Sequence, residues 1–220
     1  MSIAKLIDHT HLKPNCTEQT IANLCDEAVT FGFHSVCIPP FFVRFAKDKL
    51  SESSCKVATV IGYPYGYSTT AAKVEEIKRA NDDGADEFDI VLNIIAVKNG
   101  DSNYLKNDIE STTRAAQLRG KIVKIIVETA LLTKEEIAQV CAFCLESGVD
   151  FVKTSTGLYE GANLQDIQFM KEILGDKVKI KASGGIRNLR QAQEMIKAGA
   201  TRIGTSSGVR ILSEKDAHPQ

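Results

Sequence analysis

The sequence predicts a (β/α)8 barrel that occupies residues 1–220 as a single catalytic domain. Short apolar runs rich in β-branched residues alternate with longer segments whose apolar residues recur at helical spacing. The short runs are apolar at odd and even positions alike, which is typical of a parallel sheet covered by helices. A glycine also follows each of six helical segments, just before the next apolar run. These glycines are Gly32, Gly84, Gly120, Gly148, Gly175 and Gly199.

Seven apolar runs are interpreted as strands, and a shorter run, LIDHT at residues 6–10, is the candidate for an eighth. Eight strand–helix units in 220 residues fit a compact barrel. The alternative is an open doubly wound sheet, but no GxGxxG pattern follows the first strand. In chain order the seven strands are expected at residues 35–39, 56–62, 88–94, 122–128, 151–156, 178–182 and 202–205.

Side chains that cap helices mark where the helical segments begin. Thr17 precedes a segment that ends at Gly32, and Thr133 with Glu136 has the spacing of a capping box. The remaining helices are expected to begin at Thr69 or Thr70, Asp101, Asn163 and Asn188.

The composition excludes several classes of protein. Hydrophobic residues make up 43% of the chain and are evenly spread, which excludes a disordered chain. A net charge of -1 provides no basic excess for binding a nucleic acid. No apolar run approaches the ~20 residues of a membrane span. The N-terminus has charges and histidines where a signal peptide needs an apolar stretch, so we expect a cytoplasmic location and reduced thiols.

Cys141 and Cys144 form a CxxC pattern that suggests a redox or zinc site. Both cysteines fall on one helical stripe with Ile137, Val140 and Leu145, and no second CxxC completes a zinc site. We interpret them as small core residues, because free cysteine packs as a small hydrophobe.

Charged residues that interrupt the apolar strands are the main candidates for function, because a buried charge is costly unless it is paired or used. Lys153 and Lys181 lie on consecutive predicted strands, so their ammonium groups can approach each other and lower the pKa of one. A free lysine must lose roughly 3 pKa units to be half neutral at pH 7. Such an amine can attack a carbonyl and form a Schiff base. The alternative is that either lysine reaches the rim or pairs with a carboxylate.

The other charged residues of this group are Asp8, Asp89, Lys124 and Glu128. Asp89 lies in the middle of a predicted strand and is either a structural acid bonded to a lysine across the barrel or a partner in proton transfer. Lys124, on the next strand, is the candidate for the cation that holds it.

Three loops that contain glycine follow the last three strands, at residues 156–157, 183–185 and 204–208. Backbone N–H groups and hydroxyls near helix starts suit a phosphate, and barrels commonly place a phosphate site after strands seven and eight. The loops therefore predict a phosphate site at one rim of the barrel.

Two other patterns are candidates for binding sites. His9 and His11 share a face if they lie on a strand, but no third ligand is evident, so no metal is expected. Tyr63, Tyr65 and Tyr67 alternate with other residues after the third strand. Because no basic residues lie between them, they are expected to pack at the rim rather than to stack on nucleic-acid bases.

Several motifs, in order and over nearly the whole chain, resemble the deoxyribose-phosphate aldolase family, whose members are Schiff-base aldolases with a (β/α)8 fold. The motifs are IDHTHLKP at 7–14, VCIP at 36–39, VIGYP at 60–64, ADEFDIVL at 85–92, VETA at 127–130, FVKTSTG at 151–157, KASGGIR at 181–187 and RIGTSS at 202–207.

The resemblance implies a role for each matching residue. Lys153 would form the Schiff base, and Lys181 and Asp89 would relay protons. The residues expected to bind substrate are Asp8, Thr10, Cys37 and Lys124, and those expected to bind its phosphate are Gly157, Gly184, Gly185, Arg187, Gly204, Ser206 and Ser207.

The implied reaction is the reversible cleavage of 2-deoxy-D-ribose 5-phosphate into D-glyceraldehyde 3-phosphate and acetaldehyde, as in deoxyribonucleoside catabolism. No cofactor and no metal would be needed, the partners would be small phosphosugar and aldehyde substrates, and the family forms homodimers or larger homo-oligomers. Two departures bear on affinity and proton transfer. Leu158 stands where some relatives have a phosphate-binding lysine, and the chain ends in His218, Pro219 and Gln220 instead of a tyrosine.

Two rival functions remain open at the level of sequence. A phosphosugar epimerase or isomerase would keep the barrel and the phosphate site without needing paired strand lysines. A phosphometabolite-binding barrel without catalysis would share the same fold, so fold alone does not separate the three.

Overall fold

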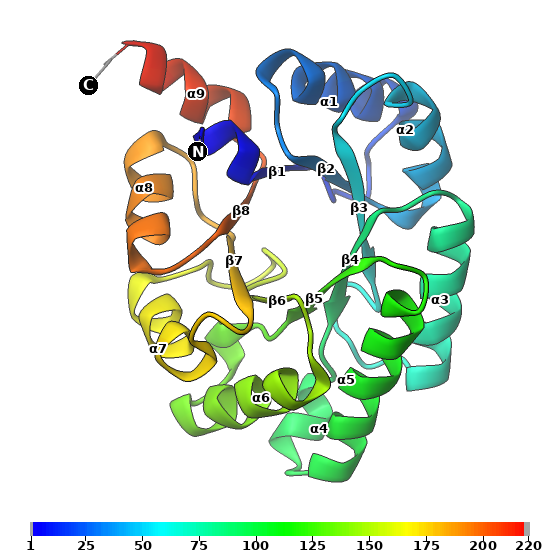
Figure 1. The fold of residues 1–220 in the computed structure, drawn as a ribbon, viewed down its shortest axis with the longest axis vertical. Coiled ribbons are helices and arrows are strands. Elements are labelled where there is room, and N and C mark those ends of the chain that lie inside the picture. Colours follow the sequence, from blue (N-terminus) through cyan, green and yellow to red (C-terminus); the bar gives the residue numbers. More distant parts are fainter. Residues whose placement is uncertain (1, 218–220) are drawn as a thin grey trace.

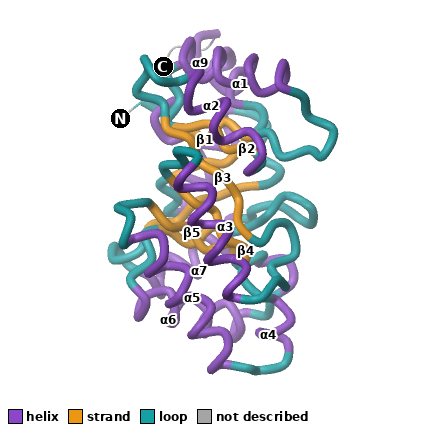
Figure 2. Tube along the Cα trace, turned by 90° about the vertical axis from the view of Figure 1, so that its right-hand side faces the viewer, coloured by secondary structure: helices purple, strands orange, loops and turns teal. Residues whose placement is uncertain are grey.

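The computed structural model describes residues 2–217, in which eight parallel strands close into a barrel surrounded by helices (Figure 1). The strands follow chain order around the barrel, and β8 pairs with β1 to close it. Figure 2, turned by 90°, shows the strands enclosed between the helices. The predicted fold class is confirmed.

The strands are β1 (Ile7–Thr10), β2 (Ser35–Ile38), β3 (Lys56–Ile61), β4 (Glu87–Val91), β5 (Ile122–Ile126), β6 (Phe151–Lys153), β7 (Lys179–Ser183) and β8 (Arg202–Thr205). The helices are α1 (Glu18–Phe31), α2 (Val43–Lys49), α3 (Thr70–Asp82), α4 (Ile94–Lys98), α5 (Ser102–Gln117), α6 (Lys134–Ser147), α7 (Leu164–Leu174), α8 (Leu189–Ala198) and α9 (Gly208–Ala217). Single 3₁₀ turns lie at η1 (Ile3–Leu6), η2 (Pro40–Phe42) and η3 (Thr129–Leu131).

The helix boundaries follow the capping residues that the sequence indicates. Thr17 and Thr133 each form a capping box with the residue three positions later. Thr69, Asp101, Asn163 and Asn188 each accept a hydrogen bond from a backbone N–H of the first helical turn. All six glycines expected at the other ends have positive φ.

Five strands end earlier than the sequence predicts, and three of them end two or three residues earlier. The runs at 88–94, 122–128 and 151–156 end as regular strands at Val91, Ile126 and Lys153. Their apolar residues continue past the strands because the chain still pairs irregularly there; the Val127 N–H, for example, donates to the Lys153 carbonyl. Helices α2, α4 and α9 were not predicted, because each is short or lies among residues assigned to a strand or a loop.

The barrel separates an apolar layer from a charged interior. Phe88 and Ile90 of β4 belong to the main hydrophobic core together with residues of the surrounding helices, whereas Glu87 and Asp89 alternate with them. The strand register places Asp89 opposite Lys124 and Lys153 opposite Lys181. Neighbouring inward positions of the barrel are therefore occupied by charged residues.

The cysteine pair of α6 belongs to the apolar layer. Cys141 and Cys144 are free, fully buried and part of the main core, which confirms their interpretation as core residues. Burial raises the pKa of the Cys141 thiol to about 12, so it stays protonated near neutral pH. Within residues 2–217, no helix combines the length and the apolar character needed to cross a membrane.

Candidate active site

A pocket of about 500 Å³ opens at the carboxyl ends of the strands, where barrel enzymes carry their chemistry. Its walls come from the loops after β1, β3, β6, β7 and β8. The lining residues are Thr10, His11, Leu12, Lys13, Pro14, Tyr63, Lys153, Thr156, Gly157, Leu158, Ser183, Gly184, Gly185, Ile186, Arg187, Gly204, Thr205 and Ser206.

Lys153 links this pocket to the charged interior. It is the last residue of β6, lines the pocket and is only 2% exposed. Its Nζ lies 2.8 Å from Asp89 Oδ2, and the Nζ of Lys181 lies 2.7 Å from the same oxygen. The two lysines are paired across neighbouring strands, as the sequence suggests, and share one carboxylate oxygen.

Asp89 is fully buried and surrounded by lysines. Lys124 donates a hydrogen bond to the second oxygen, Oδ1, over 2.8 Å, which confirms the prediction that Lys124 holds this carboxylate. Burial alone would raise the pKa of Asp89, but the charges of Lys124, Lys153 and Lys181 outweigh it and hold that pKa well below its usual value. Asp89 is therefore ionised at neutral pH.

Lys181 is also fully buried, between two carboxylates. Its Nζ lies 2.5 Å from Asp8 Oδ2 and 2.7 Å from Asp89 Oδ2. Burial alone would lower the pKa of Lys181, but Asp8 and Asp89 raise it above the usual value for lysine. Lys181 is therefore a cation beside Lys153.

A second layer of charges lies deeper in the barrel and was missed by sequence reasoning. Glu87 Oε2 lies 2.6 Å from Lys124 Nζ and 2.9 Å from Arg202 Nη1, and Arg202 also donates to Asp8 Oδ1 over 2.8 Å. Strand periodicity could have indicated Glu87, because it lies two positions before Asp89 and so shares its face. It was missed because the strand was expected to begin one residue later.

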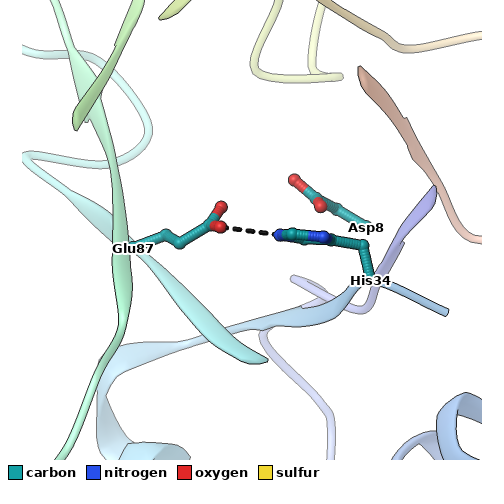
Figure 3. A group of neighbouring side chains, drawn as sticks. All are labelled: Asp8, His34 and Glu87. Carbon is teal, nitrogen blue, oxygen red and sulfur yellow. Dashed lines mark hydrogen bonds and ion pairs between the residues drawn. The ribbon is translucent and has the colours of Figure 1, made fainter. Parts of the chain in front are cut away.

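The described residues contain one group with the composition of a metal site, formed by Asp8, His34 and Glu87 (Figure 3). Their potential ligand atoms lie within 4.8 Å of one another, and His34 Nε2 lies 2.8 Å from Glu87 Oε1. Arg202 already pairs with both carboxylates, so a metal ion there would face protein cations. The donor set thus fits an ion-pair network better than a metal centre.

The histidines considered for a metal are held in other ways. His9 Nε2 lies 2.6 Å from Glu27 Oε2, and the ring packs 4.8 Å from that of Phe33. His11 is partly exposed and lines the pocket, and burial lowers its pKa, with a smaller contribution from Lys13. His218 and the C-terminal end that lacks a tyrosine lie outside the described residues.

The three alternating tyrosines divide into two environments. Tyr63 lines the pocket and donates a hydrogen bond of 3.4 Å to the Thr156 carbonyl. Burial, with smaller effects of Cys37 and Glu128, raises the pKa of Tyr63 to about 12, so its hydroxyl remains protonated. Tyr65 and Tyr67 are exposed and stack on each other with ring centroids 5.4 Å apart.

Most residues expected to hold phosphate lie together on the pocket wall. The structure places Gly157, Gly184, Gly185, Arg187, Gly204 and Ser206 there, and Ser207 is not among the lining residues. Gly184 and Gly185 have φ values of 84° and 76°, which side chains rarely adopt. A Cβ at Gly204 would lie 3.0 Å from Lys181 Cε, so glycine leaves room between this lysine and the pocket.

The residues expected to bind the rest of the substrate are divided between the pocket and the interior. Thr10 lines the pocket, whereas Asp8, Cys37 and Lys124 are fully buried and do not line it. Cys37 Sγ instead lies 3.8 Å from Asp89 Oδ2. The positions of Asp8, Cys37 and Lys124 favour a role in holding Asp89 and Lys181 over direct contact with substrate.

Sequence reasoning also missed part of the pocket wall. His11, Leu12, Lys13 and Pro14 line it, although they were quoted only as a motif. They follow β1 directly, so the rule that loops at the carboxyl ends of barrel strands form the site would have indicated them.

The closed barrel and its pocket, with a buried lysine at the floor, define an enzyme of the (β/α)8 class. The family model described as DeoC/LacD family aldolase matches residues 2–214, and the chain belongs to this family.

Relatives with established names agree with this assignment. The deoxyribose-phosphate aldolase of Thermococcus gammatolerans is 51% identical over 215 residues, which cover 96% of each chain. That of Caldicellulosiruptor saccharolyticus is 49% identical over 214 residues, with 96% of this chain and 97% of the relative covered. Among solved structures, the tetrameric deoxyribose phosphate aldolase of Aeropyrum pernix matches with a TM-score of 0.92 and 29% identity, over 98% of this chain and 91% of that chain.

Proposed function

We propose that the enzyme reversibly cleaves 2-deoxy-D-ribose 5-phosphate into D-glyceraldehyde 3-phosphate and acetaldehyde through a Schiff base on Lys153. The observation that carries this proposal is the position of Lys153, which lines the pocket while its Nζ shares one oxygen of Asp89 with Lys181. The names of the curated relatives support the substrate.

The charged groups around Asp89 include one more cation than carboxylates. The interior network joins four cationic side chains to three carboxylates: Lys124, Lys153, Lys181 and Arg202 face Asp8, Glu87 and Asp89. An uncompensated buried charge is costly, so the excess cation is best placed at the edge of the network, beside the pocket. Lys153 is the member of the network that lines the pocket, so its amine is the one placed to meet an incoming aldehyde.

The proposed chemistry uses the amine of Lys153 as nucleophile and electron sink. The amine attacks the C1 aldehyde to give a carbinolamine, which loses water to form an iminium ion. Removal of the C3 hydroxyl proton lets the C2–C3 bond break, and D-glyceraldehyde 3-phosphate leaves. The electron pair of the broken bond stays with C2 and converts the iminium into an enamine. Protonation of the enamine at C2 and hydrolysis of the resulting iminium release acetaldehyde and restore the amine.

Asp89 and Lys181 contribute to these reaction steps from behind the pocket wall. Neither lines the pocket, so we propose that they exchange protons with the substrate through a water molecule held beside Lys153. The low pKa of Asp89 makes it a weak base in the free enzyme, which assigns it chiefly to holding both lysine amines in place.

The substrate phosphate would bind at the pocket wall formed by the loops after β6, β7 and β8. Gly157, Gly184, Gly185, Gly204 and Ser206 offer backbone N–H groups or a hydroxyl there, and Arg187 adds a positive charge. Leu158 also lines this wall and is 52% exposed, so it offers no charge to the phosphate.

A direct test is to incubate the enzyme with carbon-13-labelled 2-deoxy-D-ribose 5-phosphate and follow the products by NMR. The aldolase forms labelled acetaldehyde and D-glyceraldehyde 3-phosphate. Conversion into another pentose phosphate without release of acetaldehyde would instead identify the rival phosphosugar isomerase or epimerase. Binding without any conversion would identify the non-catalytic alternative.

Further proposals concern the assembly, domain organisation, location and cofactor requirement of the protein. A homo-oligomer, a dimer or larger, is supported by the tetrameric Aeropyrum relative. The assignment of residues 1–220 to one catalytic domain, the cytoplasmic location and the lack of a cofactor requirement stay predictions, each open to measurement on the purified protein or in cells.

A further inference from the structure

Glu128 has the only positive φ of a non-glycine residue among those described, at 55°. It directly follows Val127 after β5, and its carboxyl group is buried, with the residue 2% exposed. A left-handed backbone is unfavourable for a residue with a side chain and persists only where its surroundings fix it. No step proposed above uses this residue, so its conformation calls for another reason.

The contacts of residues 127–129 supply that reason. The N–H of Val127 donates to the Lys153 carbonyl over 3.0 Å, and the N–H of Thr129 donates to the Thr154 carbonyl over 2.9 Å. The left-handed turn at Glu128 lies between these two bonds. The short segment after β5 thereby holds the backbone that carries Lys153.

The side chain of Glu128 also bonds to residues of the pocket wall. Its Oε2 accepts a hydrogen bond of 2.9 Å from the Thr156 N–H and a short one from the Thr156 hydroxyl. The Leu158 N–H in turn donates to that hydroxyl oxygen over 3.3 Å. Among the described residues, Thr156 supplies every hydrogen bond to this carboxylate, because Oε1 has no partner.

We propose that Glu128 is a positioning residue that fixes the Thr156–Gly157–Leu158 wall and thereby determines the preference for phosphorylated substrates. All three wall residues line the pocket, and Glu128 does not. The carboxylate acts from outside by orienting the backbone that faces the phosphate. This inference rests on the proposed function only in the choice of substrate, since the wall is defined by geometry.

The distinction between positioning the wall and positioning Lys153 decides which kinetic constant changes. Lys153 lies in the regular part of β6 and keeps its ladder to β5 and β7 without the Glu128 side chain. Thr156 bonds directly to that side chain, and the Leu158 N–H bonds to the Thr156 hydroxyl that the side chain orients. Loss of the carboxylate should therefore raise KM for the phosphorylated donor and leave kcat nearly unchanged.

The test compares Glu128→Ala, Glu128→Gln and Thr156→Val with the unsubstituted enzyme, using 2-deoxyribose 5-phosphate and 2-deoxyribose as donors. We expect Glu128→Ala to raise KM for the phosphorylated donor about tenfold or more, as for loss of a hydrogen bond to a charged group. KM for 2-deoxyribose should change less than about threefold. Thr156→Val should follow the same pattern, and Glu128→Gln, which retains an acceptor oxygen, should recover most of the affinity.

Thr113→Val is the matched control for Thr156→Val, because Thr113 is also buried but its hydroxyl has no partner within the described part of the chain. It should leave both KM values unchanged. The double variant Glu128→Ala, Thr156→Val should be less impaired than the two single effects combined, because both substitutions remove the bond between the carboxylate and the Thr156 hydroxyl. Equal increases of KM for both donors, or a loss confined to kcat, would overturn the inference.

Calorimetric titration with inorganic phosphate measures the affinity of the pocket wall for phosphate without any turnover. Weaker phosphate binding by Glu128→Ala, at unchanged fold by circular dichroism, would support the positioning role even if the unsubstituted enzyme cleaved neither donor. In that case the proposed function alone would fail. Phosphate binding equal to that of the unsubstituted enzyme would overturn the positioning role whatever the activity.

Discussion

The interior of the barrel and the rim of its pocket use polar groups in opposite ways. In the interior, Asp8, Glu87, Asp89 and Lys124 are buried side chains that satisfy one another across strands. At the rim, the wall formed by the loops after β6, β7 and β8 is built largely from glycine-bearing segments. The charged groups of the interior determine the protonation of the site, and the loops at the rim recognise the substrate. Lys153 is the described residue that belongs to both, since it pairs with Asp89 and lines the pocket.

Removing the residue shared by both regions should have the largest effect. Lys153→Met should reduce cleavage by at least about a thousandfold, because the other lysine that lines the pocket, Lys13, is exposed on the loop after β1 and is not paired with Asp89. Lys179→Met, which removes an exposed lysine of β7, should leave the rate unchanged. Steady-state rates of both variants check this. Substantial cleavage by Lys153→Met would break the distinction between the two regions.

Lys181 tests whether the interior controls protonation. Lys181→Met should lower kcat about a hundredfold, within the range for loss of a proton-transfer group. It should also change the pH profile of kcat, because a cation beside Lys153 is lost. KM should change little, since Lys181 does not line the pocket. An unaltered pH profile with a raised KM would assign Lys181 to the rim instead.

Glu87 tests the deeper layer through stability. Glu87→Met should lower the free energy of unfolding by about 3–5 kcal/mol, because it leaves Lys124 and Arg202 with one fewer buried partner. The control is Glu146→Met, which breaks the exposed pair with Lys106 and should have no measurable effect. Urea unfolding of both variants provides the comparison. Equal stabilities would mean that the deeper charges are not needed for folding.

The pH dependence of stability separates the interior from the rim without substitution. Asp8 and Asp89 have lowered pKa values, so their contribution is present above the unfolded value of about 4 and is lost as pH falls toward the folded value. Lys124 and Lys181 have raised pKa values, so theirs is present below about 10.4 and is lost as pH rises through the folded value.

Stability should therefore be nearly constant between about pH 5 and 9 and fall on both sides of that range. Thermal unfolding across the pH range checks this. A marked maximum inside the plateau would show that a group outside the buried network dominates.

The smallest effect is expected for an exposed rim charge. Arg187→Met should raise KM for the phosphorylated donor only severalfold, because the exposed guanidinium acts in a high dielectric. The increase should shrink at high salt, whereas the effect of Lys181→Met should not. A kcat change in Arg187→Met that persists at high salt would contradict the assignment of this residue to phosphate recognition.

Much of this architecture could be predicted from the sequence because the signals are local. Capping residues such as Thr133 and stop glycines such as Gly148 fix where helices begin and end. Helix α2 lacked such a signal: it is short, follows two prolines and has no side-chain cap. Strand ends were predicted less well because irregular pairing continues beyond Ile126 and Lys153 with residues that also suit strands.

Only part of the site could be predicted from the sequence, for a related reason. Lys153, Lys181 and Asp89 stood out because each is a charge within an apolar strand. Glu87 and Arg202 lie at the first positions of their strands, where a charge usually reaches solvent, and only the closed barrel turns them inward. The role of Glu128 depends on a contact with Thr156, which lies 28 positions away in sequence and which no spacing rule could indicate.

Borohydride reduction during turnover, followed by intact mass and peptide mapping, tests the central claim most directly. The account predicts that incubation with 2-deoxyribose 5-phosphate and borohydride adds one reduced substrate or acetaldehyde fragment to the chain, located on Lys153. It also predicts that Lys153→Met gains no such mass. An enzyme that turns over substrate without forming an adduct, or that carries the adduct on another lysine, would contradict the proposed mechanism.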